Sequence, residues 1–110
     1  MIVKLYIAVL DEFPDYMVPT LVAHTMLRAH LLFTAYEDPE YKGWINNSFK
    51  KCVLRVNSKE FEKIKQIPRA CLGYENNTLD AKISCAIPLP CKQEDLPNVL
   101  KYAKLWKPKE

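Results

Sequence analysis

Leu5-Tyr6-Ile7-Ala8-Val9-Leu10 is the stretch that decides the fold of this chain, and it leads through polar residues 11–17 into Val18-Pro19-Thr20-Leu21-Val22-Ala23-His24. A short apolar run bounded by polar residues is typical of a buried strand. Pro19 suits the first turn of a helix, because a proline lacks only an N–H that has no partner there. We therefore predict a strand over 2–10, a loop over 11–17 and a helix to about Tyr36. His24 then lies near a strand-loop-helix junction, where open α/β sheets place ligands and chemistry.

Length and composition indicate one globular domain over residues 1–110. The chain has 110 residues, of which 49% are hydrophobic and 26% charged, as in soluble globular proteins. No apolar run approaches the roughly 20 residues that a membrane helix needs, so we expect no membrane span. The N-terminal residues lack the pattern of a secretory signal, and we expect a cytoplasmic protein.

The rest of the chain alternates between strand and helix patterns. Residues 37–47 are polar, with Tyr41 and Trp44 as packing anchors. The predicted elements that follow are a strand over 52–56, a helix capped by Ser58 and ended by Pro68, a short strand over 70–74, a strand over 81–89 and a closing helix over 94–105. Such alternation predicts a mixed sheet with helices on both faces.

The predicted helix over 18–36 is apolar on two sides. One stripe should face the sheet, namely Val18, Leu21, Val22, Met26, Ala29, Phe33 and Tyr36. A second stripe lies well off it and contains His24, Thr20, Leu27 and Leu31. A helix with two apolar sides is covered by another element or docks on a partner, so the pattern predicts a cover or a homodimer through this helix.

Charge is distributed unevenly along the chain. Residues 1–48 have a net charge of −3 and residues 49–110 of +6, within a total of +3. The densest basic cluster is Lys50, Lys51, Arg55, Lys59, Lys63, Lys65 and Arg69. Two interpretations stay open: the solvated face of a strand and a helix, or a patch that contacts nucleic-acid phosphates.

Cysteine and glycine usage indicates neither a metal nor a nucleotide cofactor. Cys52, Cys71, Cys85 and Cys91 are too unevenly spaced for zinc ligands. We predict free, mostly buried thiols. The only glycines are Gly43 and Gly73, which excludes the common glycine-rich phosphate loops.

Several features together resemble the type II peptidyl-tRNA hydrolase family. They are the order of the elements, Val22-Ala23-His24 on the first helix, the strand-to-helix stretch from Lys50 to Ser58, and Ala86-Ile87-Pro88 leading to the last helix. The resemblance spans nearly the whole chain. It implies a three-layer α/β/α domain around a four-stranded mixed sheet, which hydrolyses the ester of peptidyl-tRNA without a cofactor.

The resemblance also implies roles for individual residues. His24 matches the histidine of the family's first helix, and Asp11 lies one residue from an expected loop aspartate. Lys50 and Lys51 match basic residues that precede the second strand, and the region from Lys50 to Arg55 would touch the tRNA backbone. An imidazole titrates near neutral pH and can take a proton from water.

The sequence departs from the family at positions that would assist this histidine. Met17 and Leu21 stand where the family has lysine and glutamine, and the family's Asp-Ala-Gly loop is not matched. Thr20, Asp11 or Ser84 would have to take over those roles. Two interpretations therefore remain: a peptidyl-tRNA hydrolase, or a catalytically inactive binding or regulatory module that dimerises or docks a protein partner.

Overall fold

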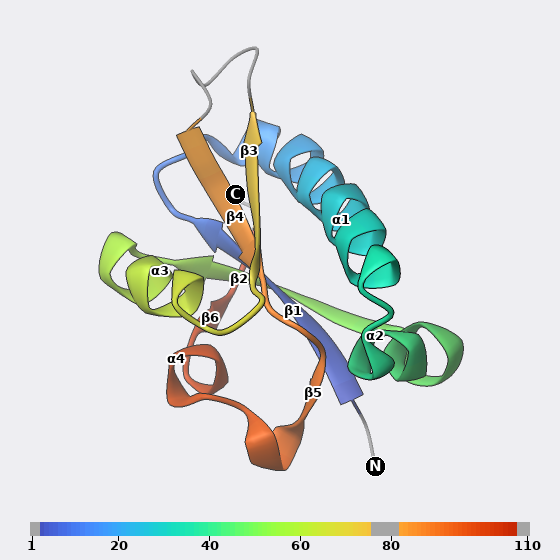
Figure 1. The fold of residues 1–110 in the computed structure, drawn as a ribbon. Coiled ribbons are helices and arrows are strands. Elements are labelled where there is room, and N and C mark those ends of the chain that lie inside the picture. Colours follow the sequence, from blue (N-terminus) through green and yellow to red (C-terminus); the bar gives the residue numbers. More distant parts are fainter. Residues whose placement is uncertain (1–2, 76–81, 108–110) are drawn as a thin grey trace.

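The computed structural model describes residues 3–75 and 82–107, which form a mixed α/β fold around one sheet (Figure 1). The helices are α1 (Val18–Ala35), α2 (Pro39–Gly43), α3 (Ser58–Lys65) and α4 (Asn98–Lys101). The strands are β1 (Val3–Leu10), β2 (Lys50–Val56), β3 (Cys71–Glu75), β4 (Lys82–Ile87), β5 (Cys91–Lys92) and β6 (Lys104–Leu105). Ile2 and Ala81, where two strands were predicted to begin, lie outside the described residues.

The sheet has six strands in the order β3-β4-β1-β2-β6, with β5 paired to β1. β1 and β2 run parallel, from Lys4 opposite Lys50 to Leu10 opposite Val56. β4 is antiparallel to β1, and β3 is antiparallel to β4. The mixed α/β class is thus confirmed, whereas the prediction of four strands was wrong. β5 and β6 have two residues each, too few to show any periodicity in the sequence.

The central strand β1 carries the core. Its residues from Leu5 to Leu10 are all buried, so both faces of the strand are covered, as the continuous apolar run predicts. α1 packs against β3, β4 and β1, while α3 packs against β1 and β4. In Figure 1, α1 lies to the right of β3 and β4, and α3 lies to their left. None of the helices in the described part of the chain combines the length and apolarity needed to cross a membrane.

α1 presents a slightly different face to the sheet from the predicted one. Its buried residues are Val18, Leu21, Thr25, Ala29 and Phe33. Tyr36, which was predicted to face inward, is 64% exposed. The centre of the face is a threonine, whose hydroxyl donates to the Leu21 carbonyl at 2.9 Å. This bond satisfies the buried hydroxyl, so a polar residue is tolerated where hydrophobicity alone favours an apolar one.

Residues 37–47, which were predicted as a polar connecting segment, contain helical structure. They contain α2, and a π-helical turn over Trp44–Ser48 follows it. Tyr41 and Trp44 are buried at 2% and 1% exposure, which confirms them as packing anchors. Phe49 ends the π-helical turn in a left-handed conformation with φ of 56°, and its ring stacks on Trp44.

The start of α3 was predicted one residue too late. Asn57, and not Ser58, is the N-cap: its side chain accepts from the Glu60 amide, and the Glu60 carboxylate accepts from the Asn57 amide. This reciprocal pair is a capping box built on asparagine.

The predicted closing helix over 94–105 was wrong. A 3₁₀ turn covers Gln93–Asp95, α4 has only four residues, and the chain then joins the sheet as β6. Pro97 divides the segment, because a proline cannot donate the backbone hydrogen bond that a continuous helix would need there.

Gly73→Ala should destabilise the fold. A Cβ at Gly73 would lie 1.8 Å from Oγ1 and 2.6 Å from Cβ of Thr25, and such overpacking typically costs about 1–3 kcal/mol. Thr25→Gly should reduce that cost in the double variant. Gly43→Ala is the matched control, because nothing lies within 4 Å of its added Cβ. Urea unfolding measures the wild type, the three single variants and the double variant, and an unchanged stability of Gly73→Ala would contradict the close contact.

Candidate functional site

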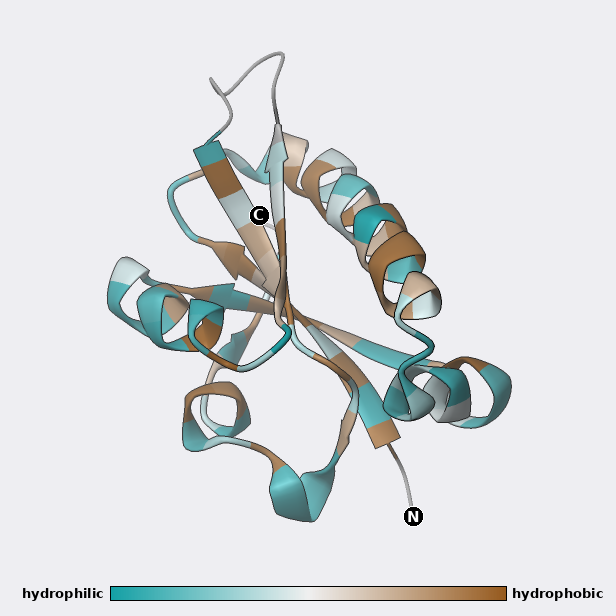
Figure 2. Ribbon diagram, viewed as in Figure 1, coloured by the Kyte–Doolittle hydropathy of each residue, from teal (hydrophilic) through white to brown (hydrophobic). Residues whose placement is uncertain are grey.

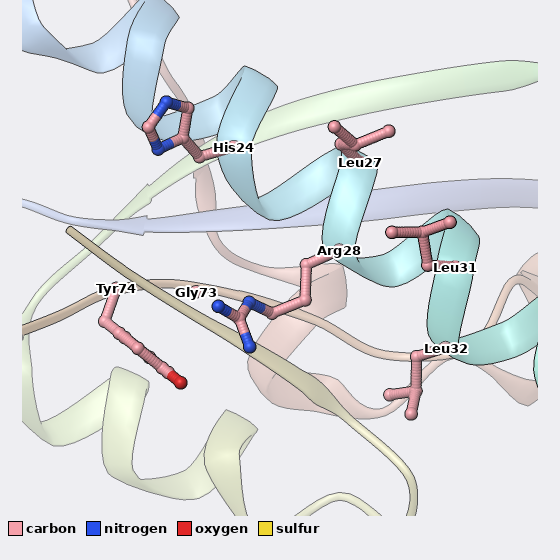
Figure 3. A pocket seen from close by; sticks show the side chains of 7 residues that line it. All are labelled: His24, Leu27, Arg28, Leu31, Leu32, Gly73 and Tyr74. Atoms are coloured by element: carbon pink, nitrogen blue, oxygen red, sulfur yellow. The ribbon is translucent and has the colours of Figure 1, made fainter. Parts of the chain in front are cut away.

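A hollow of about 680 Å³ lies between α1 and β3 (Figure 3). Its position follows from helical spacing, because residues three or four apart share one face of a helix. The lining residues are His24, Leu27, Arg28, Leu31 and Leu32 of α1 and Gly73 and Tyr74 of β3. The hollow therefore combines an imidazole, a guanidinium and a phenol with leucine side chains.

The close packing of α1 on β3 brings the polar groups of the hollow together. Thr25 faces Gly73, so the neighbouring Tyr74 lies beside the next turn of α1. The Arg28 guanidinium carbon lies 4.4 Å from the centroid of the Tyr74 ring, within the range of a cation–π contact. Figure 3 shows the Arg28 side chain reaching from the helix toward Tyr74, with the His24 ring on the preceding turn.

Of the predicted catalytic residues, only His24 lines this hollow. Thr20 lies one turn before His24 on α1 and is exposed. Asp11 follows β1, is exposed, and donates its backbone N–H to the Val56 carbonyl at 2.9 Å. Ser84 is buried at 1% exposure with its hydroxyl 3.4 Å from the Gly73 carbonyl. Ser84 therefore supports β3 from within the core.

The predicted nucleic-acid contacts separate into two groups. Lys50 and Lys51 are exposed at the start of β2. The Lys51 ammonium donates to the Phe49 carbonyl at 2.9 Å and lies 3.4 Å from the centroid of the Phe49 ring. Arg55 lies at the other end of β2, opposite Val9. With about 3.3 Å per strand residue, Arg55 is about 16 Å from Lys50.

Arg55 is already occupied by the fold. Its guanidinium pairs with the Asp15 carboxylate at 2.9 Å and donates to the Lys107 carbonyl at 3.0 Å. Three-quarters of its side chain is buried, since the exposed fraction is 26%. Lys50 and Lys51 are therefore better placed than Arg55 to meet an external phosphate.

A second hollow of about 410 Å³ lies beside the first. Leu27 lines both, and Lys51, Trp44 and Phe49 are among the residues on the far side of the second hollow. His30 also borders it and shares a hydrogen bond of 2.8 Å with the Tyr41 hydroxyl. Leu27 thus stands between the His24 hollow and the basic start of β2.

A third hollow, of about 690 Å³, lies near the start of β1 and β2. Its rim has both signs of charge, with Glu40 and Asp95 against Lys50 and Lys92. It contains no histidine and no arginine among the described lining residues. Its charged groups are the carboxylates and ammonium groups of these four residues.

Arg28 and Tyr74 were missed by sequence reasoning. Arg28 follows His24 by four residues, so helical spacing could have found it. Tyr74 could not be found in this way, because its place beside Arg28 depends on how tightly β3 packs against α1.

The four cysteines are free thiols with limited exposure to solvent. All four are free, as predicted, and Cys71 and Cys85 are buried while Cys52 and Cys91 are half-buried. Burial raises the pKa of the Cys85 thiol and outweighs the hydrogen bonds from Thr25 and Ser84, which lower it. Burial likewise raises the pKa of Cys71 and Cys91. A raised pKa disfavours the thiolate that a nucleophilic cysteine needs. Among the residues that the structure describes, no three histidine, cysteine or acidic side chains group as metal ligands.

Stability should fall above about pH 9, partly because of Cys85. The pKa of its thiol in the folded protein is raised above the ordinary 9.0, so the thiol loses its proton first in the unfolded chain. This deprotonation stabilises the unfolded state relative to the folded one as pH rises from the unfolded pKa to the folded pKa. Urea unfolding at pH 7, 9 and 10 should show a smaller alkaline loss in Cys85→Ala than in the wild type. Equal losses in the two proteins would contradict this assignment.

A scan of protein-family models finds no match to this chain, and a search of the curated proteins finds no relative. A function based on the resemblance to type II peptidyl-tRNA hydrolases is therefore a proposal.

Proposed function

We propose that this protein is a cofactor-free hydrolase of the ester bond in peptidyl-tRNA or a related acylated tRNA, built as a three-layer α/β/α domain and working in the cytoplasm. The observation that carries the proposal is a single hollow lined by His24, by the Arg28–Tyr74 pair and by exposed leucines. Ester hydrolysis needs a base for water, a positive group for the developing oxyanion and a surface that orients the substrate.

His24 is the general base in this proposal. It takes a proton from a water molecule as the water oxygen attacks the ester carbonyl. The bond between that carbonyl carbon and the 3′ oxygen of the tRNA then breaks, and the proton passes from the imidazolium to the leaving 3′ oxygen. The products are a free peptide and a tRNA with its 3′ hydroxyl, and no other reactant is needed.

Arg28 and Tyr74 hold the reacting ends of the substrate. The guanidinium supplies positive charge for the tetrahedral oxyanion or the nearest phosphate. The face of Tyr74 opposite Arg28 offers a stacking surface for the terminal base, as aromatic side chains do for single-stranded RNA. The leucines contact the apolar part of the acyl group. Thr20, one turn before His24, and Asp11, at the end of β1, do not line the hollow, so this proposal gives them no step in the reaction.

The tRNA backbone would continue past Leu27 to Lys50 and Lys51. The second hollow connects the His24 region with Lys51, and an exposed pair of lysines suits a phosphate chain. Arg55 would contribute less than predicted from its charge, because Asp15 already neutralises it.

Single-turnover cleavage of N-acetyl-aminoacyl-tRNA tests this function. His24→Ala should lose at least about a hundredfold in rate, which is the low end of acid–base contributions. Lys59→Ala is a matched control, because Lys59 is exposed on α3. Lys50→Ala/Lys51→Ala should raise the enzyme concentration for half-maximal cleavage and leave the saturated rate near the wild-type value. Circular dichroism confirms folding of each variant.

Two outcomes would contradict the proposal. The wild-type protein would leave the substrate intact, or folded His24→Ala would cleave it at the wild-type rate. Rescue of His24→Ala by added imidazole would separate a lost base from a displaced helix.

A second candidate is a catalytically inactive binding or regulatory module that dimerises or docks a partner through α1. It is favoured by one observation: Leu27 and Leu31 are 62% and 63% exposed on the same side of the helix. Figure 2 shows hydrophobic residues recurring along α1. Two results together would support this second function. The wild-type protein would show no turnover, and it would sediment as a dimer while the Leu27→Lys variant sediments as a monomer.

A further inference from the structure

β3 is an edge strand with one unpaired side. The sheet order ends at β3, whose described partner is β4 alone. Every second residue of such a strand turns its N–H and C=O away from the sheet. An edge of this kind can accept another extended chain.

α1 forms a wall beside this edge. The hollow lies between the helix and β3, so an added strand would lie along Gly73 and Tyr74 with α1 on one side of it. Leu27, Leu31 and Arg28 line that wall. Figure 1 shows β3 beside the N-terminal part of α1, and Figure 3 shows Arg28 extending over the strand.

The charges of the groove favour an acidic segment. Arg28 is exposed, and no carboxylate is found among the described residues that line the hollow. A guanidinium binds a carboxylate through charge-assisted hydrogen bonds. The exposed leucines favour apolar side chains at positions that alternate along a strand.

We propose that the groove between α1 and β3 binds an extended peptide by strand addition, with alternate apolar side chains against the leucines and a carboxylate at Arg28. Backbone hydrogen bonds to β3 provide affinity and the groove provides specificity, as in other cases of strand addition. The β3–β4 register shifts between Gly73 and Tyr74, so the paired segment is short, about three to five residues. This binding needs no ester and no proton transfer, so it goes beyond the proposed hydrolysis, but it uses the same hollow and the same Arg28, and a peptide and an acylated tRNA would compete for them.

Fluorescence anisotropy with a labelled pentapeptide, leucine-threonine-leucine-threonine-aspartate, tests the proposal. Its two leucines and the aspartate share one face of a strand. Two further peptides carry N-methyl groups either on both leucines or on both threonines. Strand addition predicts that only one of these two loses binding, because successive N–H groups of a strand point to opposite sides.

Charge exchange locates the peptide on the protein. Arg28→Glu should weaken binding of the aspartate peptide by about tenfold or more, as expected for a lost charge-assisted hydrogen bond. A peptide that ends in lysine should recover binding to Arg28→Glu. Lys101→Glu is the matched control, because Lys101 is exposed on α4 away from the groove.

Three results would overturn the proposal. Equal binding of all three peptides would show apolar adhesion without strand pairing. No binding of the unmethylated peptide up to millimolar concentration would exclude this class of ligand. Self-association of the protein that Arg28→Glu abolishes would assign the groove to a second copy of the chain. The peptides contain no ester, so these results are independent of whether the protein cleaves peptidyl-tRNA.

Discussion

The contact between Gly73 and Thr25 is the constraint on which the arrangement of α1 and β3 depends. Any side chain at position 73 would overlap Thr25, with the nearest approach at 1.8 Å. The helix consequently lies close against the edge strand of the sheet. This close packing of α1 on β3 places Tyr74 beside Arg28. It also forms the hollow that His24 lines. The buried Thr25 hydroxyl is satisfied within its own helix, so the contact leaves no unpaired donor in the core.

Much of the fold could be predicted from local pattern. The apolar run from Leu5 to Leu10 marked the central strand, and Pro19 marked the start of α1. Two errors, the continuous closing helix and the count of four strands, have a common physical origin. The sequence between Glu94 and Leu105 has helical periodicity, but Pro97 divides it and the pairing of β6 with β2 removes its last residues. Edge pairing of this kind depends on tertiary contacts, which a single segment does not encode.

The candidate site was predictable only in part, because its members come from different levels of structure. His24 could be identified from its place on the first helix. Arg28 shares that helix face, whereas Tyr74 joins the site through the packing of β3. The prediction of Arg55 as a nucleic-acid contact considered charge without its partners. Asp15, forty residues earlier in the chain, pairs with it at 2.9 Å, so the basic cluster is less uniform in space than in sequence.

Chemical-shift mapping with a stable substrate fragment tests most directly whether the hollow between α1 and β3 is the functional site. The fragment is N-acetyl-leucyl adenosine with an amide in place of the 3′ ester, added to ¹⁵N-labelled protein. We expect the largest amide shift changes at His24, Arg28, Gly73 and Tyr74. Largest changes around Cys91 and Lys92, in the hollow near the start of β1, or no changes at all, would contradict the account.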